Sequence, residues 1–290
     1  MTGANSGIGK ETARILYSKN AKVYCAARSK EKALDAIDSI KAAHPDSHGE
    51  LVFLPLDLAD LTTIRHSVDE FLAKEAKLHV LFNNAGVMNP PNGSKTAQGY
   101  ELQLGVNNLG TFLLTKLLTP TLVRTARAEP DAPSSVRVVW VSSSAAEALQ
   151  APRGGVDLSN LDYHVDKSPL DKYCISKAGN YLQAAEFARR HSGSGGDGDG
   201  VVSVPLNPGN LDSDLWRTQT PRAQAFLRRF VLYPPVLGAY TLLFAAFSPE
   251  VTVERSGEWG ESLLLFPLSP LCPFWRPIFF FFFVVTGGFG

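Results

Sequence analysis

Short apolar stretches alternate with amphipathic helical stretches along most of the chain. Apolar residues run almost without interruption in the first kind, at 21–27, 51–56, 78–82, 136–141 and 201–206, which predicts buried β-strands. The second kind has apolar residues at helical spacing and covers 10–18, 30–43, 61–74, 99–128 and 169–190, with a break at Pro120. Since strands buried on both faces and separated by helices form parallel sheets, we predict one doubly wound α/β domain over residues 1–260.

A glycine-rich turn opens this pattern, in Thr2-Gly3-Ala4-Asn5-Ser6-Gly7-Ile8-Gly9. Gly3 and Gly7 permit backbone angles that other residues avoid, and Gly9 lets the following helix pack closely. The helix N-terminus offers unpaired N–H groups, so the turn predicts a pyrophosphate site of a Rossmann-like fold. Such a turn normally follows a buried strand, and only Met1 precedes it here. We therefore expect a truncated first strand whose neighbours carry unpaired backbone groups.

The balance of charges excludes some classes of partner. Lys plus Arg and Asp plus Glu each number 28, so no overall charge favours a nucleic acid. The three cysteines lie far apart and the six histidines form no ligand pair, so we predict neither a disulfide framework nor a metal site. Unpaired cysteines and the lack of a signal-like opening favour a reducing, cytoplasmic compartment.

The stretch 261–290 departs from the α/β pattern. Four prolines lead into an apolar run, from Ile278 to Val285, that contains five consecutive phenylalanines. A membrane-spanning helix needs about 20 apolar residues, and the prolines and Arg276 prevent a backward extension of this run. We expect an atypical, aggregation-prone tail, with membrane attachment as the less favoured alternative.

Two Tyr-x-x-x-Lys sequences compete for a chemical role. The first, Tyr163 to Lys167, lies in a loop-like region that Pro169 separates from the next helix. The second, Tyr173 to Lys177, follows Ser168 as a predicted N-cap and Pro169 at the first helical position. Four residues apart on one helix, Tyr173 and Lys177 share a face, and an ammonium near a phenol lowers its pKa. We therefore favour Tyr173 as an acid/base group.

The motifs of this chain, taken in order, resemble those of short-chain dehydrogenases/reductases, in particular retinol-dehydrogenase-like and fungal members. The resemblance runs from Thr2 to about Trp259. It rests on the turn at 2–9, Asn83-Asn84-Ala85-Gly86, Val106-Asn107-Asn108-Leu109-Gly110, Val141-Ser142-Ser143, Tyr173 with Lys177, and Asn207-Pro208-Gly209 with Ser213. Chance supplies one or two such segments, but not all of them in the family's order.

The resemblance implies a role for each matched residue. Ser143, rather than either neighbouring serine, would hydrogen-bond the substrate oxygen, and Tyr173 would exchange a proton with it. Lys177 would bind the nicotinamide ribose, and Asn107 would hold a water of a proton relay. Contacts with the cofactor are implied for Gly3, Asn5, Ser6, Gly7, Ile8, Gly9, Asp57, Asn84, Ala85, Gly86, Tyr173, Lys177, Pro208, Gly209 and Ser213.

Three asparagine or aspartate residues, Asn83, Asn107 and Asp57, also allow a purely structural interpretation. From the residues alone, Asn83 could satisfy buried backbone groups, as the resemblance also implies. Asn107 could lie on a helix surface, and Asp57 could belong to the N-cap region of the next helix.

The end of the strand after the glycine turn indicates the type of dinucleotide. NAD-binding folds usually carry an acidic residue here for the ribose 2′-OH, and this chain has Ala27. Arg28 follows, and a guanidinium pairs well with the 2′-phosphate of NADP, with Ser29 and Lys32 as further contacts. NADP(H) is therefore favoured over NAD(H), with a surface ion pair of Arg28 as the alternative.

These features predict an NADP(H)-dependent oxidoreductase that transfers a hydride between the nicotinamide and an alcohol or carbonyl substrate. Apolar side chains such as Trp216, Phe226 and Phe230 favour a lipophilic small molecule. The resemblance also implies homo-oligomers. Two alternatives stay open: a truncated or degenerate member of the fold without catalysis, and a reductase attached to a membrane through its tail.

Overall fold

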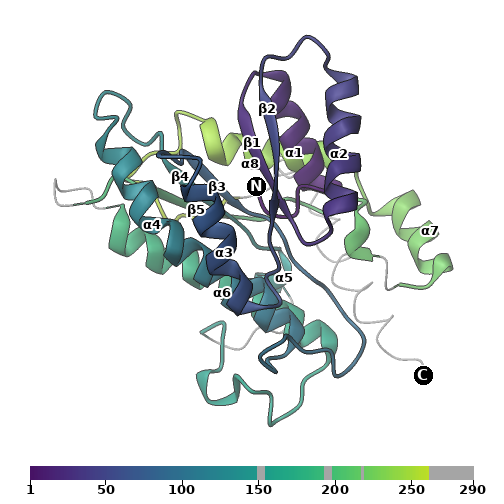
Figure 1. Cartoon of the computed structure of the whole chain (residues 1–290). Coiled ribbons are helices and arrows are strands. Elements are labelled where there is room, and N and C mark those ends of the chain that lie inside the picture. Colours follow the sequence, from purple (N-terminus) through teal and green to yellow (C-terminus); the bar gives the residue numbers. More distant parts are fainter. Residues whose placement is uncertain (149–153, 193–197, 217–218, 261–290) are drawn as a thin grey trace, which may run out of the picture.

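The strands of the chain are parallel and form two hydrogen-bonded groups. The computed structural model describes residues 1–148, 154–192, 198–216 and 219–260, so the predicted tail lies outside the described residues. One group pairs β1 (Lys22–Ala27) with β2 (Glu50–Pro55), and the other has the order β3 (Val80–Asn83), β4 (Arg137–Val141), β5 (Val202–Leu206). All five predicted strands are confirmed within one or two residues, and so is the doubly wound α/β fold (Figure 1).

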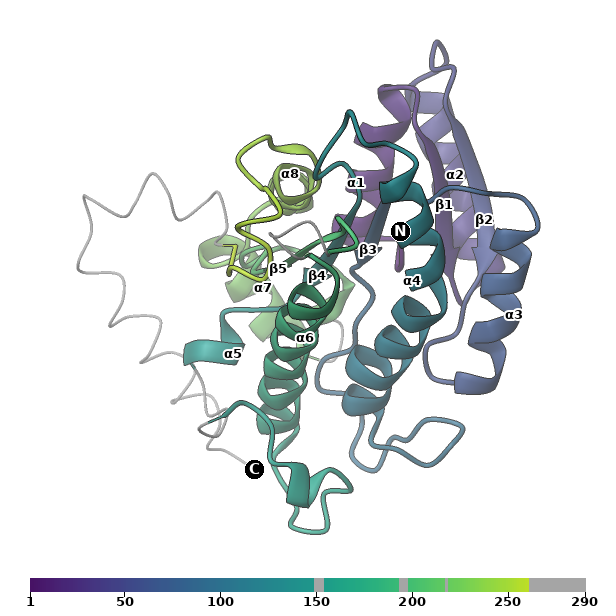
Figure 2. The same cartoon turned by 90° about the vertical axis from the view of Figure 1, so that its left-hand side faces the viewer.

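Helices cover both faces of the strands (Figures 1 and 2). One apolar core joins the strands to α1 (Gly7–Ser18), α2 (Lys30–Ala43) and α8 (Pro235–Phe247). A second core joins the opposite face to α3 (Leu61–Leu72), α4 (Thr111–Arg127) and α6 (Pro169–His191). Two shorter helices are α5 (Ala145–Ala148) and α7 (Pro221–Phe230). Within the described ranges, every helix is too short or too polar to cross a membrane.

The expected gap in the sheet lies between β1 and β3. Met1, Thr2 and Gly3 span it at the carboxyl ends of the two strands: Ala26 N donates to Met1 O at 2.9 Å, Gly3 N to Ala26 O at 2.9 Å, and Thr2 N to Phe82 O at 3.0 Å. Both sheet groups also contribute side chains to one apolar core. These contacts anchor the glycine turn. Along the rest of the facing edges of β1 and β3, no strand from the described part of the chain lies between them.

The predicted helix over 99–128 is wrong in two respects. A π-helix (Leu104–Gly110) forms part of this stretch and continues into α4, and residues 99–101 are not helical. Pro120 also lies inside α4 instead of ending it. Proline removes one helical N–H, so the carbonyl of Lys116 loses its partner. Because Lys116 and Pro120 are both exposed, water can bond that carbonyl, and the helix continues.

Candidate active site

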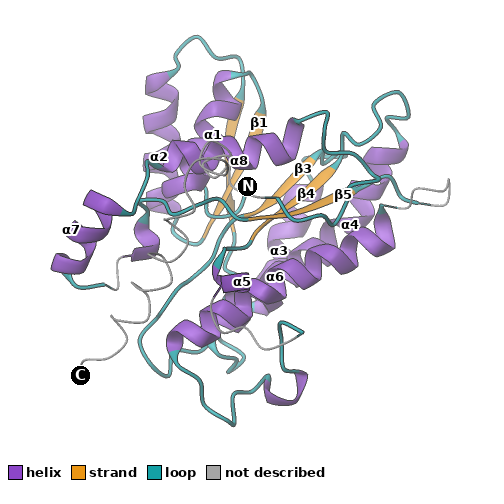
Figure 3. Cartoon of the chain, turned by 180° about the vertical axis from the view of Figure 1, so that it is seen from behind, coloured by secondary structure: helices purple, strands orange, loops and turns teal. Residues whose placement is uncertain are grey.

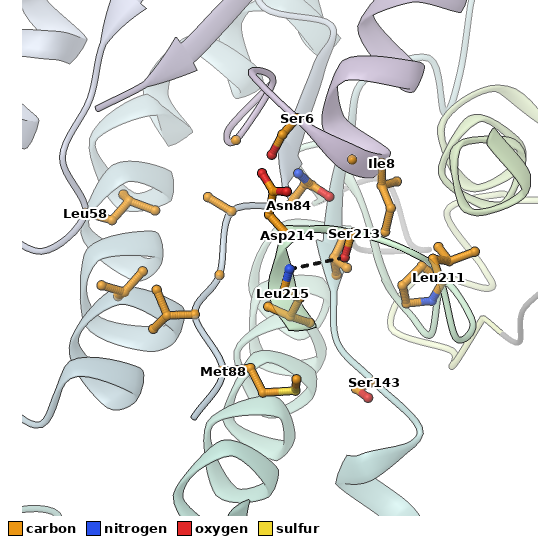
Figure 4. Close-up of a pocket in the computed structure, with 18 of the residues that line it drawn as sticks. Ser6, Ile8, Leu58, Asn84, Met88, Ser143, Leu211, Ser213, Asp214 and Leu215 are labelled. Carbon is orange, nitrogen blue, oxygen red and sulfur yellow. Dashed lines mark hydrogen bonds between the residues drawn. The ribbon is translucent and has the colours of Figure 1, made fainter. Parts of the chain in front are cut away.

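Most of the predicted site residues line one cavity of about 640 Å³ at the carboxyl ends of the strands (Figure 4). They are Gly3, Asn5, Ser6, Gly7, Ile8, Arg28, Asp57, Asn84, Ala85, Gly86, Ser143, Tyr173, Lys177, Pro208, Gly209 and Ser213. Gly9 and Asn107 are absent from the lining. The tertiary structure thus brings together segments as far apart in the sequence as Gly3 and Ser213.

The glycine turn has the shape of an anion cradle. Gly3 and Gly7 have φ angles of +68° and +52°, in the region that favours glycine. A Cβ on Gly9 would lie 2.2 Å from Gly3 O, so this glycine allows α1 to begin directly behind the turn. Ser6, the N-cap of α1, makes no side-chain capping bond, and the first turn has no acidic residue. The N–H groups at the start of α1 are therefore suited to a pyrophosphate.

Thr2 fixes the turn to the loop after β3. Its hydroxyl donates to Phe82 O at 3.1 Å and accepts from Asn84 N at 3.0 Å and from Ala85 N at 2.9 Å. Asn84 Nδ2 also donates to Thr2 O at 2.9 Å. Thr2 is not among the predicted site residues, although it begins the glycine motif. Its buried hydroxyl couples two segments of the cavity wall.

α6 presents Tyr173 and Lys177 on one face, as predicted. Ser168 Oγ caps the helix by accepting from Asp171 N at 3.1 Å, and Pro169 is the first helical residue. Lys177 Nζ lies 5.8 Å from the centre of the Tyr173 ring and donates to Val141 O at 2.9 Å. Both side chains are buried at the inner end of the cavity.

Burial shifts both of these groups toward their neutral forms. It raises the pKa of the Tyr173 phenol, and a hydrogen bond with Ser143 opposes part of this rise. Burial also lowers the pKa of Lys177 to about 8. The predicted lowering of the Tyr173 pKa is therefore wrong for the chain by itself, because desolvation of the buried phenol is the dominant effect.

The hydroxyls after β4 point to different partners. Ser142 Oγ donates to Lys177 O at 2.7 Å and is buried, so it joins β4 to α6. Ser143 hydrogen-bonds with Tyr173, and its Oγ also accepts from Ala145 N at 3.2 Å. Ser143 and Tyr173 are thus the pair of hydroxyls that can meet one substrate oxygen.

Asn107 lies behind the cavity wall in the π-helix. It is fully buried, which excludes the helix-surface alternative. Its Oδ1 accepts from Val87 N at 2.8 Å, and its Nδ2 donates to Val87 O at 3.0 Å and to Ser176 Oγ at 2.9 Å. Both Nδ2 hydrogens and one lone pair of Oδ1 are therefore used in joining three segments of the protein.

The other Tyr-x-x-x-Lys sequence does not reach the cavity. Tyr163 lies in a loop with a φ angle of +54°, and Lys167 is not on a helix with it. Lys172 Nζ lies 5.2 Å from the centre of the Tyr163 ring. Of the two sequences, the second is the one whose tyrosine and lysine line the cavity.

The cavity extends from α6 to the end of β1. Arg28 lines this outer end together with Ser29 and Lys32. Asp57 lines it as well, and its Oδ1 accepts from Ala59 N at 2.9 Å. β1 ends at Ala27, which is buried and has no carboxylate. The strand end therefore lacks the acidic group that would bind the ribose 2′-OH of NAD.

Apolar side chains surround Tyr173 at the inner end. Met88, Leu170, Leu215 and Trp216 pack with it and line the cavity. Phe226 and Phe230, which were predicted to form the apolar substrate site together with Trp216, do not line the cavity. Both are exposed on α7. Met88 and Leu170 were not predicted, since an apolar residue after a strand or at a helix start has no distinctive spacing.

Comparison with known proteins shows the family of the chain. A family model described as short chain dehydrogenase matches residues 1–153. A short-chain dehydrogenase/reductase of Phomopsis amygdali is 59% identical over 267 residues, covering 90% of this chain and 78% of the relative. A second one, from Phaeosphaeria nodorum, is 48% identical over 272 residues, covering 92% and 84%.

Solved structures share the fold. A Pseudomonas aeruginosa RhlG/NADP active-site complex has a TM-score of 0.66 and 22% identity, covering 90% of this chain and 92% of that one. An NADPH-bound carbonyl reductase from chicken fatty liver has a TM-score of 0.63 and 20% identity, covering 90% and 96%. With the family match, the relatives and the fold in agreement, this chain belongs to the short-chain dehydrogenase/reductase family of oxidoreductases, which have an NAD(P)-binding fold.

Proposed function

We propose that the chain is an NADP(H)-dependent oxidoreductase that interconverts a lipophilic carbonyl compound and its alcohol. The observation that carries the proposal is the convergence of Ser143, Tyr173 and Lys177 with the glycine turn in one cavity. A proton donor for an oxygen atom and a cradle for a dinucleotide are the two parts that such a reaction needs.

The residues present fit a dinucleotide. The uncapped start of α1 and the left-handed glycines of the turn suit a pyrophosphate, and Arg28 suits a 2′-phosphate. Asp57 would lie beside the adenine, and Lys177 would bind the nicotinamide ribose. When bound, the nicotinamide supplies or accepts the hydride.

The protein's own residues would manage the proton. In the reducing direction, the Tyr173 hydroxyl donates its proton to the substrate oxygen, while Ser143 holds that oxygen by a hydrogen bond. A raised pKa keeps the phenol protonated and ready to donate before the substrate arrives. The ammonium of Lys177 then stabilises the phenolate that forms. Because both Nδ2 hydrogens and one lone pair of Oδ1 are bonded, Asn107 would support any proton relay by positioning Val87 and Ser176.

The preference for NADP(H) rests on the outer end of the cavity. Arg28, Ser29 and Lys32 offer one guanidinium, one hydroxyl and one ammonium there. A guanidinium forms two parallel hydrogen bonds with a phosphate, and Ala27 contributes no opposing charge.

The preference for a lipophilic substrate rests on the inner end. Met88, Leu170, Leu215 and Trp216 surround the hydroxyl pair with apolar surface. A neutral, apolar ketone, aldehyde or alcohol would bury its carbon skeleton there and place a single oxygen against Ser143 and Tyr173.

An optical assay tests the proposal directly. NADPH oxidation is followed against a panel of apolar ketones and aldehydes for the unchanged chain, Tyr173→Phe and the matched control Tyr163→Phe. Loss of the group that transfers the proton to the substrate oxygen should lower turnover at least about a hundredfold in Tyr173→Phe. NADPH binding, measured by fluorescence titration, should persist in both variants.

Two results would overturn the proposal. Comparable turnover in Tyr173→Phe and Tyr163→Phe would remove Tyr173 from the chemistry. Tight NADPH binding without turnover of any compound in the panel would instead favour a non-catalytic member of the fold.

A further inference from the structure

α7 (Pro221–Phe230) is a short amphipathic helix that buries none of its ten residues. Figures 1 and 3 show it at the edge of the molecule, away from the strands. Thr220 Oγ1 caps it by accepting from Ala223 N at 3.3 Å, and Arg228 pairs with Asp212 at 3.0 Å. Because isolated helices shorter than about 12 residues are marginal in water, α7 would gain stability from a surface to pack against.

The outward side of α7 combines aromatic rings with arginines. Helical spacing places Arg222, Phe226, Arg229 and Phe230 on neighbouring positions of one side, and all four are exposed. The rings of Phe226 and Phe230 are 5.0 Å apart, and the Arg229 guanidinium lies 5.4 Å from the Phe230 ring. Phe230 is 63% exposed, and Tyr233, three residues further, is 46% exposed.

The charge of this side is positive. α7 contains three arginines and no acidic residue. Among the described residues, no carboxylate lies within ion-pairing distance of Arg222 or Arg229. The chain as a whole has a formal net charge of zero, so α7 is a local cationic feature. Two-fold pairing of α7 with a second copy would bring like charges together, which is unfavourable.

We propose that α7 docks on an anionic lipid surface. Exposed aromatic rings insert at the headgroup level of a bilayer, and arginines beside them bind lipid phosphates. Phe230 and Tyr233 supply the rings, and Arg222 and Arg229 supply the charges. The helix lies in the plane of the interface and does not span the bilayer.

The position of α7 also connects this surface with the cavity. Trp216 and Gln219 line the cavity, and Gln219 precedes the first residue of α7 by only two positions. Docking therefore brings a wall of the cavity next to the lipid. Lipid binding does not depend on the proposed reaction, and its test needs no turnover.

Vesicle co-sedimentation of the full chain tests the proposal. We expect binding to phosphatidylcholine vesicles that contain phosphatidylserine, weak binding to phosphatidylcholine alone, and loss of binding at high salt. Each arginine near such a surface contributes about a factor of five, so Arg222→Gln with Arg229→Gln should weaken binding roughly 30-fold. Phe230→Ser should weaken it as well.

Matched controls remove the same groups elsewhere. Arg189→Gln with Arg190→Gln takes two exposed charges from α6, and Phe247→Ser takes an exposed ring from α8. Both controls should bind as the unchanged chain does. Because every substituted side chain is exposed, circular dichroism should stay unchanged. Melting should shift only slightly, in the α6 control through the lost ion pairs of Arg189 and Arg190 with Glu186. In a Phe230→Trp variant, brominated lipids should quench the added fluorescence.

Three results would overturn the proposal. The first is absence of binding to the phosphatidylserine vesicles. The second is equal binding by the α7 variants and the α6 and α8 controls, which would place the contact elsewhere on the chain. The third is a dimer in solution that Phe230→Ser dissociates, which would assign this side of α7 to a second copy of the chain.

Discussion

Asn107 Nδ2 donates a 2.9 Å hydrogen bond to Ser176 Oγ, and this bond fastens the π-helix to α6 one residue before Lys177. Ser176 Oγ in turn donates to Tyr173 O at 2.8 Å. Both side chains are fully buried, so water cannot replace either partner. The relative position of the cavity wall and α6 therefore depends on an amide and a hydroxyl that do not line the cavity.

Substitution of this pair should destabilise the fold more than it changes the surface of the site. Asn107→Ala leaves the N–H and C=O of Val87 without their partners and should lower the free energy of unfolding by about 3 kcal/mol. Ser176→Ala should cost about 1 kcal/mol. Urea denaturation measures both values.

The double variant provides the control for this coupling. If the two residues act through one bond, Asn107→Ala with Ser176→Ala costs less than the sum of the single losses. Losses that add within error would show that the bond does not couple the two segments.

Buried Lys177 should give the chain without cofactor a distinctive dependence on pH. Its pKa is lowered to about 8, whereas an unfolded lysine has a pKa of about 10.4. Between these values the unfolded state binds more protons, so the free energy of unfolding should rise from about pH 8 to pH 10. Below about pH 8 the buried charge is a constant penalty on the fold.

Lys177→Met should remove that rise and increase stability near pH 7 by about 2 kcal/mol. Val141 O keeps a partner in this variant, because Asn180 Nδ2 also donates to it at 3.2 Å. Lys167→Met, in the exposed loop before α6, is the matched control and should retain the rise. Urea denaturation at pH 7 and pH 9.5 distinguishes the variants, and an unchanged slope in Lys177→Met would refute this account.

Arg28 should determine the choice between the two dinucleotides. Loss of a charged hydrogen-bond donor to the 2′-phosphate should weaken NADPH binding by Arg28→Ala about 10- to 100-fold, with NADH binding unchanged. Ala27→Asp should act in the opposite sense, because a carboxylate repels the phosphate and accepts from a ribose hydroxyl. Fluorescence titration with each dinucleotide provides the comparison.

Lys30→Ala is the control for the Arg28 variants. Lys30 is exposed two residues further along and does not line the cavity, so its loss should leave both affinities unchanged. Equal weakening of NADPH and NADH binding by Arg28→Ala would mean that the arginine has a structural role only.

The sequence by itself determined the order of elements and most of the cavity lining. Nearly continuous apolar runs such as Val136 to Val141, interrupted only by Arg137, favour buried central strands. Glycines at 3, 7 and 9 favour a phosphate-binding turn before a helix. Ser168 and Pro169 likewise marked the start of α6, because caps act through neighbouring residues. Local patterns of this kind carry their physical cause within a few residues.

Only the tertiary structure decided the features that depend on packing between distant segments. Desolvation of Tyr173 and Lys177, which sets the direction of both pKa shifts, requires the surrounding wall. The burial of Asn107 follows from its bonds to Val87 and Ser176, 20 and 69 residues away. The exposure of Phe230 is the converse case. An aromatic residue at helical spacing suggests a core, but among the described residues no element covers Phe230, which is 63% exposed.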